Sequence, residues 1–218
     1  MEKINEKANP SELQVLLIDL DDTLYSSDSG VWEMIRTRMQ KYMLEEMNIS
    51  PDEVPVLRNR LWRQYGTTLR GLKAEFEVDE EDFLAYVHDV PMEEHIIVDT
   101  ELRNMLQALP QRKFVFTNSH YAHANRVTGL LGVRDQFEGI IDIYAMMPYC
   151  KPQVEAFQIA LDIVQDRPEH CLLVDDSPDN LSTAKALGMT TISIGAHHHE
   201  ASPHIESIHH LKAFLPES

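Results

Sequence analysis

The feature that most constrains this chain is an apolar run that ends in two aspartates, within the segment QVLLIDLDDTLYSS at residues 14–27. The run from Val15 to Ile18 shows no alternation of apolar and polar residues, which is typical of a strand covered by helices on both faces. It brings Asp19 and Asp21 to the end of that strand. Because an uncompensated buried charge is strongly unfavourable, we expect the rest of the sequence to supply cations for these carboxylates.

The second half of the chain alternates strand-like and helix-like segments. Short apolar runs at 113–117, 137–143, 171–174 and 190–194 are separated by segments in which apolar residues recur at helical spacing. This alternation is typical of right-handed βαβ units. We therefore predict an α/β fold with a Rossmann-like parallel sheet and helices on both faces. The functional site of such a sheet lies outside the carboxyl ends of its strands.

Residues 25–97 are patterned as helices instead. An apolar stripe with three- and four-residue spacing predicts one amphipathic helix, formed by Val31, Trp32, Ile35, Met39, Tyr42, Met43 and Met47. Its Met and aromatic residues are predicted to pack rather than to bind a ligand. Further along, Ser50, Pro51 and Glu53 predict the start of a second helix, with Ser50 as N-cap and Glu53 closing a capping box.

Four polar clusters fall at strand ends or helix starts: Asp19 with Asp21, Thr117 with Asn118 and Ser119, Lys151, and Asp175 with Asp176. The carboxylates would repel one another without a cation, and Mg²⁺ with oxygen ligands relieves that repulsion. Lys151 can add a fixed positive charge, and Thr117 precedes a helix start that suits a phosphate oxygen. Together these groups indicate phosphoryl transfer through an aspartyl-phosphate.

Four motifs, DLDDTL, FTNS, CKP and VDDSPDN, occur in the order found in haloacid dehalogenase (HAD) superfamily phosphatases, which the chain resembles from residue 14 to about residue 194. The resemblance implies a HAD catalytic core at residues 1–24 and 98–218 and an inserted α-helical cap at 25–97. The segments DLDDTLYSSDSG, YGTTLRGL and TNSHYAHANRV resemble, more narrowly, the pyrimidine 5'-nucleotidase-like branch.

The resemblance also implies roles for five residues of the first three motifs. Asp19 would be the nucleophile and a metal ligand. Asp21 would be the general acid and base, and its backbone carbonyl would meet the metal. Thr117 and Asn118 would bind the transferring phosphoryl group. Lys151 would neutralise negative charge on Asp19 and on that group.

For the fourth motif the resemblance implies that Asp176 completes the Mg²⁺ site as the direct ligand, with Asp175 assisting. The family often has a second acid four residues after this aspartate. Here Asn180 stands at that position, with Asp179 beside it. Either side chain could contact water in the metal shell.

These features predict an enzyme that hydrolyses a small phosphomonoester with Mg²⁺, most specifically a pyrimidine nucleoside 5'-monophosphate. The alternatives are a phosphatase for a sugar phosphate or phosphoglycolate, a phosphosugar mutase, and a non-catalytic nucleotide-binding regulator. A haloacid dehalogenase needs neither the metal nor an acid two residues after the nucleophile, so Asp21 argues against it.

Within the helical segment, five residues are candidates to contact the leaving group: Trp62, Tyr65, Thr67, Thr68 and Arg70. An aromatic ring can stack on a base, and an arginine can hold a phosphate or a carbonyl. Core packing for Trp62 and a surface role for Arg70 are the alternatives. The oligomeric state is left open.

The net charge of −17 excludes a nucleic-acid polymer or an anionic membrane as partner, because both require a basic surface. Two cysteines in unrelated contexts, Cys150 and Cys171, indicate no disulfide framework. The amino terminus lacks the apolar stretch of a secretory signal, so we expect a cytoplasmic protein. Six histidines near the carboxyl end are predicted to lie in a solvated loop rather than at a metal: His197, His198, His199, His204, His209 and His210.

Overall fold

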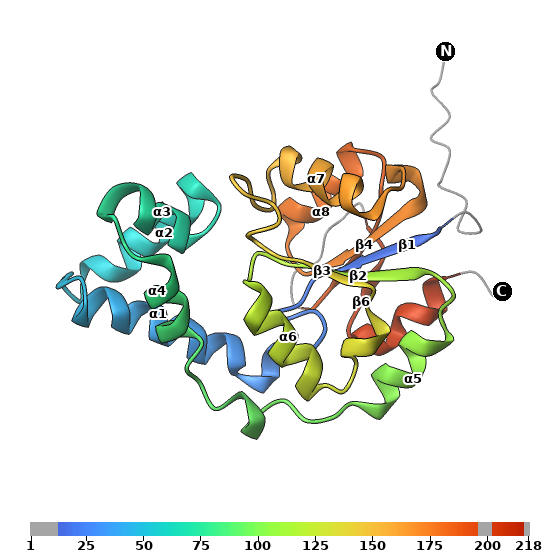
Figure 1. Ribbon diagram of the computed structural model, residues 1–218, viewed down its shortest axis with the longest axis horizontal. Helices are drawn as coiled ribbons and strands as arrows, with labels where there is room; N and C mark the ends of the chain where they lie inside the picture. The colour runs from blue at the N-terminus through green and yellow to red at the C-terminus, as the bar shows by residue number, and fades with distance from the viewer. Residues whose placement is uncertain (1–12, 196–201, 216–218) are drawn as a thin grey trace, which may run out of the picture.

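The computed structural model describes residues 13–195 and 202–215, and these contain a six-stranded parallel sheet (Figure 1). The strands are β1 (Val15–Ile18), β2 (Arg112–Phe116), β3 (Gly139–Ile141), β4 (Cys171–Asp175), β5 (Thr190–Ile194) and β6 (His204–Ile205). Their spatial order is β3-β2-β1-β4-β5-β6, and every neighbouring pair is parallel. The predicted Rossmann-like α/β fold is therefore confirmed.

Helices cover both faces of the sheet. Leu16 and Ile18 of β1 belong to an apolar cluster with α5 (Thr100–Ala108), α6 (Tyr121–Leu130) and the 3-10 helix η6 (Ile208–Phe214). The alternate residues, Val15 and Leu17, pack with α7 (Val154–Val164) and α8 (Pro178–Ala186). Since successive side chains of a strand point to opposite faces, burial on both sides explains why the sequence of β1 is apolar without alternation.

Four helices stand between β1 and β2 in the chain: α1 (Val31–Glu45), α2 (Glu53–Tyr65), α3 (Thr68–Phe76) and α4 (Glu80–Val87). They are flanked by short 3-10 turns, η2 (Ser27–Ser29) and η3 (Met92–Glu94). Figure 1 shows them grouped beyond the carboxyl end of β1, on the side away from the amino terminus. The helical patterning of residues 25–97 thus corresponds to real helices. The exact division between core and cap stays a prediction.

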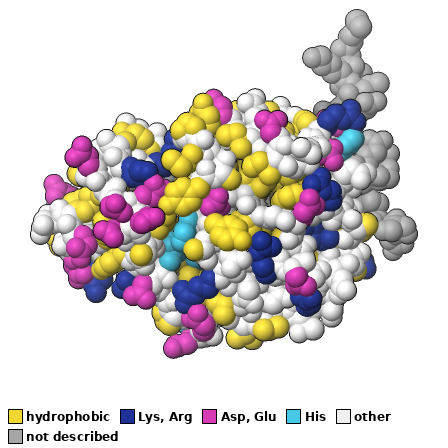
Figure 2. All heavy atoms as spheres, in the orientation of Figure 1, with side chains coloured by type: hydrophobic (Ala, Val, Ile, Leu, Met, Phe, Trp, Pro, Cys, Tyr) yellow, Lys and Arg dark blue, Asp and Glu magenta, His cyan; other side chains and the backbone are white. Residues whose placement is uncertain are grey.

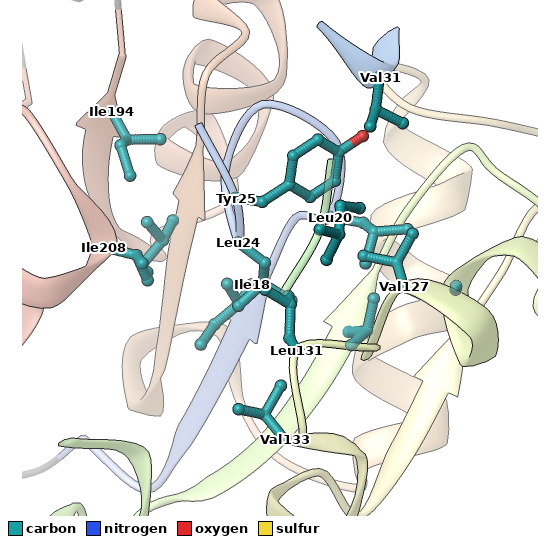
Figure 3. Packing of buried hydrophobic residues seen from close by; sticks show 14 of the residues in the cluster. Ile18, Leu20, Leu24, Tyr25, Val31, Val127, Leu131, Val133, Ile194 and Ile208 are labelled. Carbon is teal, nitrogen blue, oxygen red and sulfur yellow. The ribbon is translucent and has the colours of Figure 1, made fainter. Parts of the chain in front are cut away.

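The chain remains in the core for a short distance after the two aspartates. Leu24 and Tyr25 are buried in the same cluster as Ile18 and Leu20, before Val31 begins α1 (Figure 3). This anchoring fixes the peptide on which Asp21 lies, since residues on both sides of it are held by apolar contacts.

Side chains cap the starts of two helices. The Thr67 hydroxyl accepts a hydrogen bond from the Arg70 backbone N–H at the start of α3, and Asp99 does the same for Leu102 at the start of α5.

The predicted start of α2 is wrong. This helix begins at Glu53, and the Ser50 hydroxyl donates to the Glu53 carboxylate instead of capping the helix. The physical reason is Pro55, which has no N–H to continue the ladder from Pro51.

The predicted solvated loop is wrong for two of the histidines. His204 lies in β6, where its Nδ1 is 3.0 Å from the Ser193 hydroxyl oxygen, and His209 Nε2 is 2.9 Å from Asp99 Oδ2. His197, His198 and His199 lie outside the described residues. Of the helices in residues 13–195 and 202–215, none combines the length and apolar character needed to cross a bilayer.

Candidate active site

The carboxyl ends of β1, β2 and β4 meet around one buried ammonium group. Lys151 Nζ donates hydrogen bonds of 2.7 Å to Asp19 Oδ1, to Asp175 Oδ2 and to the Phe116 carbonyl. The Lys151 side chain is 1% exposed. Burial opposes its charge, but the two carboxylates outweigh burial and raise the pKa of Lys151. The cation that Asp19 requires is therefore supplied from a distant part of the chain.

The loop that carries Lys151 is held by Asn118. The Asn118 amide donates to the Lys151 carbonyl and accepts from the Lys151 backbone N–H, both at 2.9 Å. We predicted a phosphate contact for Asn118, and its side chain is occupied by this pairing. Thr117 is buried beside it, and its hydroxyl oxygen accepts a hydrogen bond from Ser119 N–H. Asn118 thus positions the lysine, and Thr117 lies at the floor of the site.

Three carboxylates lie close enough to share one cation. Oxygen atoms of Asp19, Asp175 and Asp176 are all within 4.8 Å of one another. Burial and repulsion from Asp175 raise the pKa of Asp176 to about 7. Burial also raises the pKa of Asp19 well above its usual value, with Lys151 only partly offsetting it and the other two aspartates adding to it. The single charge of Lys151 does not balance three carboxylates, so the donor set fits a hard divalent ion such as Mg²⁺.

The two aspartates of the fourth motif differ in their hydrogen bonds. Asp175 is fully buried and accepts from Lys151, from Ser177 N–H and from the Asn180 amide, which reaches both of its oxygens. Asp176 is half-buried and has no side-chain hydrogen bond to any described residue. This difference favours Asp176 as a direct metal ligand. Because Asn180 is committed to Asp175, the exposed Asp179 is the better candidate to contact water in the metal shell.

Asp21 does not join that group, since its side chain is held elsewhere by three donors. Tyr25 Oη and Ser119 Oγ donate to it at 2.6 Å, and His123 Nε2 lies 2.8 Å from Oδ1. Burial alone would raise the pKa of Asp21, but His123 and the other two donors lower it far below its usual value. The site therefore has two carboxylates two residues apart whose pKa values are shifted in opposite directions, upward for Asp19 and downward for Asp21.

The contacts of Tyr25 and His123 were not predicted from the sequence. The only signal available was that both lie next to a strand end, Tyr25 after β1 and His123 in the first turn of the helix that follows β2. His123 is also one of three histidines whose rings lie close together. The centroid of the His88 ring is 4.5 Å from those of both His120 and His123, and burial with these neighbours lowers the pKa of His88 to about 3. Figure 2 shows histidine side chains where α1–α4 meet the rest of the protein.

A cavity of about 420 Å³ lies between the sheet and the helices α1–α4. Its floor contains Asp19, Asp21, Thr117, Asn118, Lys151 and Asp176. Its opposite wall contains side chains of α1, α2 and α4, among them Trp32, Arg36, Met39, Arg58 and Trp62. The volume is that of a site for a small ligand.

The five residues of the helical segment that we singled out behave differently from one another. Trp62 is 51% exposed and lines the cavity, and Thr67 and Thr68 also line it. Tyr65 instead donates a hydrogen bond to Glu75. Arg70 donates to Cys150 Sγ, to Gln153 Oε1 and to the Pro148 carbonyl, so it joins α3 to the loop that carries Lys151.

The arrangement can therefore do three things. It can hold a divalent ion beside Asp19, bind a phosphate against Thr117 and Lys151, and offer Asp21 as a separate proton donor or acceptor. The helices enclose the opposite side of the cavity and can contact the remainder of a substrate.

Comparisons with known proteins agree with this geometry. The chain is 26% identical over 209 residues to phosphate metabolism protein 8 of Saccharomyces cerevisiae, covering 86% of this chain and 65% of that relative's length. The HAD-hydrolase YfnB of Bacillus subtilis, whose structure is bound to magnesium, matches with a TM-score of 0.64 and 18% identity over 93% of this chain and 98% of its own. A β-phosphoglucomutase of Clostridium difficile matches with a TM-score of 0.61 and 16% identity, over 91% and 93%.

These two structures share the fold. The family itself follows from a family model that matches residues 13–188, which span β1 to the end of α8 and include all four motifs. The chain belongs to the haloacid dehalogenase-like hydrolases.

Proposed function

We propose that this hydrolase is a Mg²⁺-dependent phosphomonoesterase that works through an aspartyl-phosphate on Asp19. The observation that carries the proposal is the Lys151 ammonium, bound at 2.7 Å to both Asp19 and Asp175, beside Asp176 and the buried Thr117. Carboxylates that can hold a cation thus lie next to a lysine and a threonine that can bind a phosphate. This arrangement suits phosphoryl transfer, in which positioning and positive charge supply most of the catalysis.

In the first step a carboxylate oxygen of Asp19 attacks phosphorus, and the bond from phosphorus to the leaving oxygen breaks. Lys151 offsets negative charge on Asp19 and on the phosphoryl oxygens, and Thr117 holds one of those oxygens. This step requires the protonated form of Asp21, whose proton goes to the leaving oxygen as that oxygen departs as an alcohol. The cap proposed for residues 25–97 encloses this step and restricts the access of water.

In the second step water attacks the phosphorus of the aspartyl-phosphate, and the bond to Asp19 breaks to release phosphate. Asp21 accepts the proton of that water. The hydrogen bonds from Tyr25, Ser119 and His123 stabilise the carboxylate form of Asp21, which is the form that this step requires.

The proposed metal ligands are the side chains of Asp19 and Asp176 and the backbone carbonyl of Asp21, with Asp175 assisting. When bound, Mg²⁺ supplies positive charge to the phosphoryl oxygens and to the nucleophile. The raised pKa values of Asp19 and Asp176 support this assignment, because both carboxylates need a cation to ionise fully.

For the substrate we propose a small phosphorylated metabolite and, more narrowly, a pyrimidine nucleoside 5'-monophosphate. The motifs around Asp19, Gly66 and Asn118 support the narrower choice, as does the exposed Trp62, which lines the cavity and can stack on a base. The name of the yeast relative also refers to phosphate metabolism. The cytoplasm is the proposed location, since its reducing conditions suit two buried, free thiols.

The test is phosphate release from UMP, CMP, AMP, phosphoglycolate and sugar phosphates with Mg²⁺. We expect activity that EDTA abolishes and Mg²⁺ restores, with UMP and CMP preferred. The variant Asp19→Asn should lose at least about 1,000-fold in kcat. Asp162→Asn, an exposed aspartate of α7, is the matched control and should retain activity.

The same assay separates the rival functions. Full activity in Asp19→Asn would refute the mechanism, and activity led by sugar phosphates would remove the pyrimidine preference. An isomerised phosphosugar product would indicate a mutase, the activity named for one structural neighbour. Halide release from a 2-haloacid would indicate a dehalogenase. Nucleotide binding without phosphate release at any Mg²⁺ concentration would indicate a regulator.

A further inference from the structure

The cavity wall opposite the catalytic floor contains two arginines, each four residues from a tryptophan. Trp32 and Arg36 lie one turn apart on α1, and Arg58 and Trp62 lie one turn apart on α2. Residues four apart share a helix face, and all four side chains line the same cavity as Asp19. The wall is therefore basic and aromatic, whereas the floor is acidic.

The two arginines differ in how their charge is balanced. Arg36 pairs with Glu33 one turn earlier on α1, and its charge partly offsets the burial and the Asp21 charge that raise the pKa of Asp22. Arg58 is half-buried and makes no hydrogen bond or ion pair with any residue in 13–195 or 202–215. Burial and the like charge of Arg36 lower the pKa of Arg58, and the charge of Glu33 opposes them only in part.

A half-buried guanidinium that lacks a paired anion destabilises the protein unless a ligand supplies that anion. A partly desolvated guanidinium with no directly paired carboxylate, beside a second guanidinium, loses solvation and gains repulsion. Among the described residues, no aspartate that lines the cavity forms an ion pair with Arg58. A planar guanidinium presents paired N–H donors that match the two oxygens of a carboxylate or phosphate.

We propose that Arg58, assisted by Arg36, binds a second anionic group on the substrate, a carboxylate or a phosphate carried by the leaving group. This inference rests on the proposed phosphatase activity and is independent of the pyrimidine preference. The substrate then has one anion at Thr117 and Lys151 and another at Arg58, with an apolar or planar body against Trp62. Arg58 becomes a residue that determines substrate specificity, and the helices select esters by their charge.

The test compares pairs of phosphomonoesters that differ in one anionic group. Orotidine 5'-monophosphate is uridine 5'-monophosphate with an added carboxylate, and 3-phosphoglycerate has a carboxylate where glycerol 3-phosphate has a hydroxymethyl group. The measured quantity is the ratio of kcat/KM for the ester with the second anion to kcat/KM for its partner. Because a hydrogen bond to a charged group is lost without Arg58, we expect a ratio of about 10–100 in the wild type for at least one pair.

Four arginine variants test whether Arg58 is the source of this ratio. Arg58→Ala should bring that ratio close to one, and Arg58→Lys should restore part of it because the positive charge returns. Arg36→Ala should lower the ratio less. Arg63→Ala removes an exposed arginine of the same helix that does not line the cavity, and it should keep the wild-type ratio. Thermal melting of each variant separates these effects from unfolding.

Two results would overturn the inference: a wild-type ratio near one for both pairs, or a ratio that Arg58→Ala leaves intact. Either can occur while phosphate release is normal, so the proposed phosphatase would stand. If the wild type hydrolyses none of these esters, the proposed function fails instead. In that case the dissociation constants of the same esters, measured by calorimetry with Mg²⁺, test whether Arg58 binds a second anion. Equal affinities within each pair would refute the inference.

Discussion

Replacing Lys151 by methionine tests whether its ammonium holds the acidic floor together. The side chain is 1% exposed, and its three hydrogen bonds go to Asp19, Asp175 and the Phe116 carbonyl. Methionine has nearly the same length and no charge. It would leave two carboxylates buried next to each other, with Asp176 close by.

The expected cost follows from those contacts. Removing one partner of a buried ion pair costs about 3–5 kcal/mol, because the remaining charge is uncompensated. For a chain of this size that lowers Tm by about 6–20 °C, at about 2–4 °C per kcal/mol. Lys113→Met is the matched control: this lysine is also buried, but its ammonium donates only to the Leu109 and Gln111 carbonyls. Its loss should cost only about 1–3 kcal/mol.

The two variants should also differ in their response to pH. Without Lys151 the pKa of Asp19 rises further above its unfolded value, because burial still raises it and the charge that lowered it is gone. Such carboxyl groups destabilise the folded state at high pH, and the penalty disappears as pH falls through the raised pKa. Urea unfolding at pH 8 and pH 5, without metal, should therefore show the deficit of Lys151→Met shrinking at pH 5. The deficit of Lys113→Met should not change. Equal deficits for the two variants, or a Lys151→Met deficit that is the same at both pH values, would refute the reasoning.

Two further predictions concern the histidines beside Asp21. His123→Ala removes a hydrogen bond that positions Asp21, so kcat for an alkyl phosphate should fall by about tenfold or more, while p-nitrophenyl phosphate, whose leaving group needs little protonation, should be less affected. Equal losses on both esters would mean that His123 has only a structural role. His88 has a folded-state pKa of about 3, below its value in the unfolded chain, so its protonation favours unfolding as pH falls below about 6.5. Urea unfolding should show the wild type losing about 2 kcal/mol from this group between pH 7.5 and pH 5, and His88→Phe should lose correspondingly less; identical losses would contradict this.

The strands were predictable because burial on both faces leaves a simple pattern. The segments predicted at 113–117, 171–174 and 190–194 correspond to β2, β4 and β5, with bounds that differ by at most one residue. β3 is shorter than predicted, at Gly139–Ile141, since only that part pairs with β2. β6 has two residues, too few to leave a periodic signal.

The residues of the floor were predictable for a different reason. Each follows a strand or precedes a helix, and parallel strands bring their carboxyl ends to one edge. The strand topology alone therefore brings Asp19, Lys151 and Asp176 near one another. The hydrogen-bond partner of each side chain does not follow from the topology. The amide of Asn118 pairs with the Lys151 backbone, and Asn180 pairs with Asp175, because the local chain path aims them there.

The helical pattern of α1 does not show which of its apolar residues face the core and which face the cavity. The apolar stripe of α1 was predicted to pack, and Ile35 and Met43 are buried as expected. Trp32 and Met39 belong to the same stripe and pack against this core, and they line the cavity as well. Positions three apart on a helix differ by about 60° around its axis, so one stripe spans both a core-facing and a cavity-facing edge.

Which edge meets the cavity depends on how the helices dock, and this is set by contacts far apart in sequence. Arg70 binds the Cys150 thiol and the Pro148 carbonyl, and close contact between Gly66 and Cys150 leaves no room there for a Cβ atom. These contacts hold the hairpin of α2 and α3 against the Lys151 loop, which turns the face with Arg58 toward the floor. An arginine one turn from a tryptophan is ordinary in sequence, and it becomes a candidate specificity residue only when this docking leaves its charge unmatched inside the cavity.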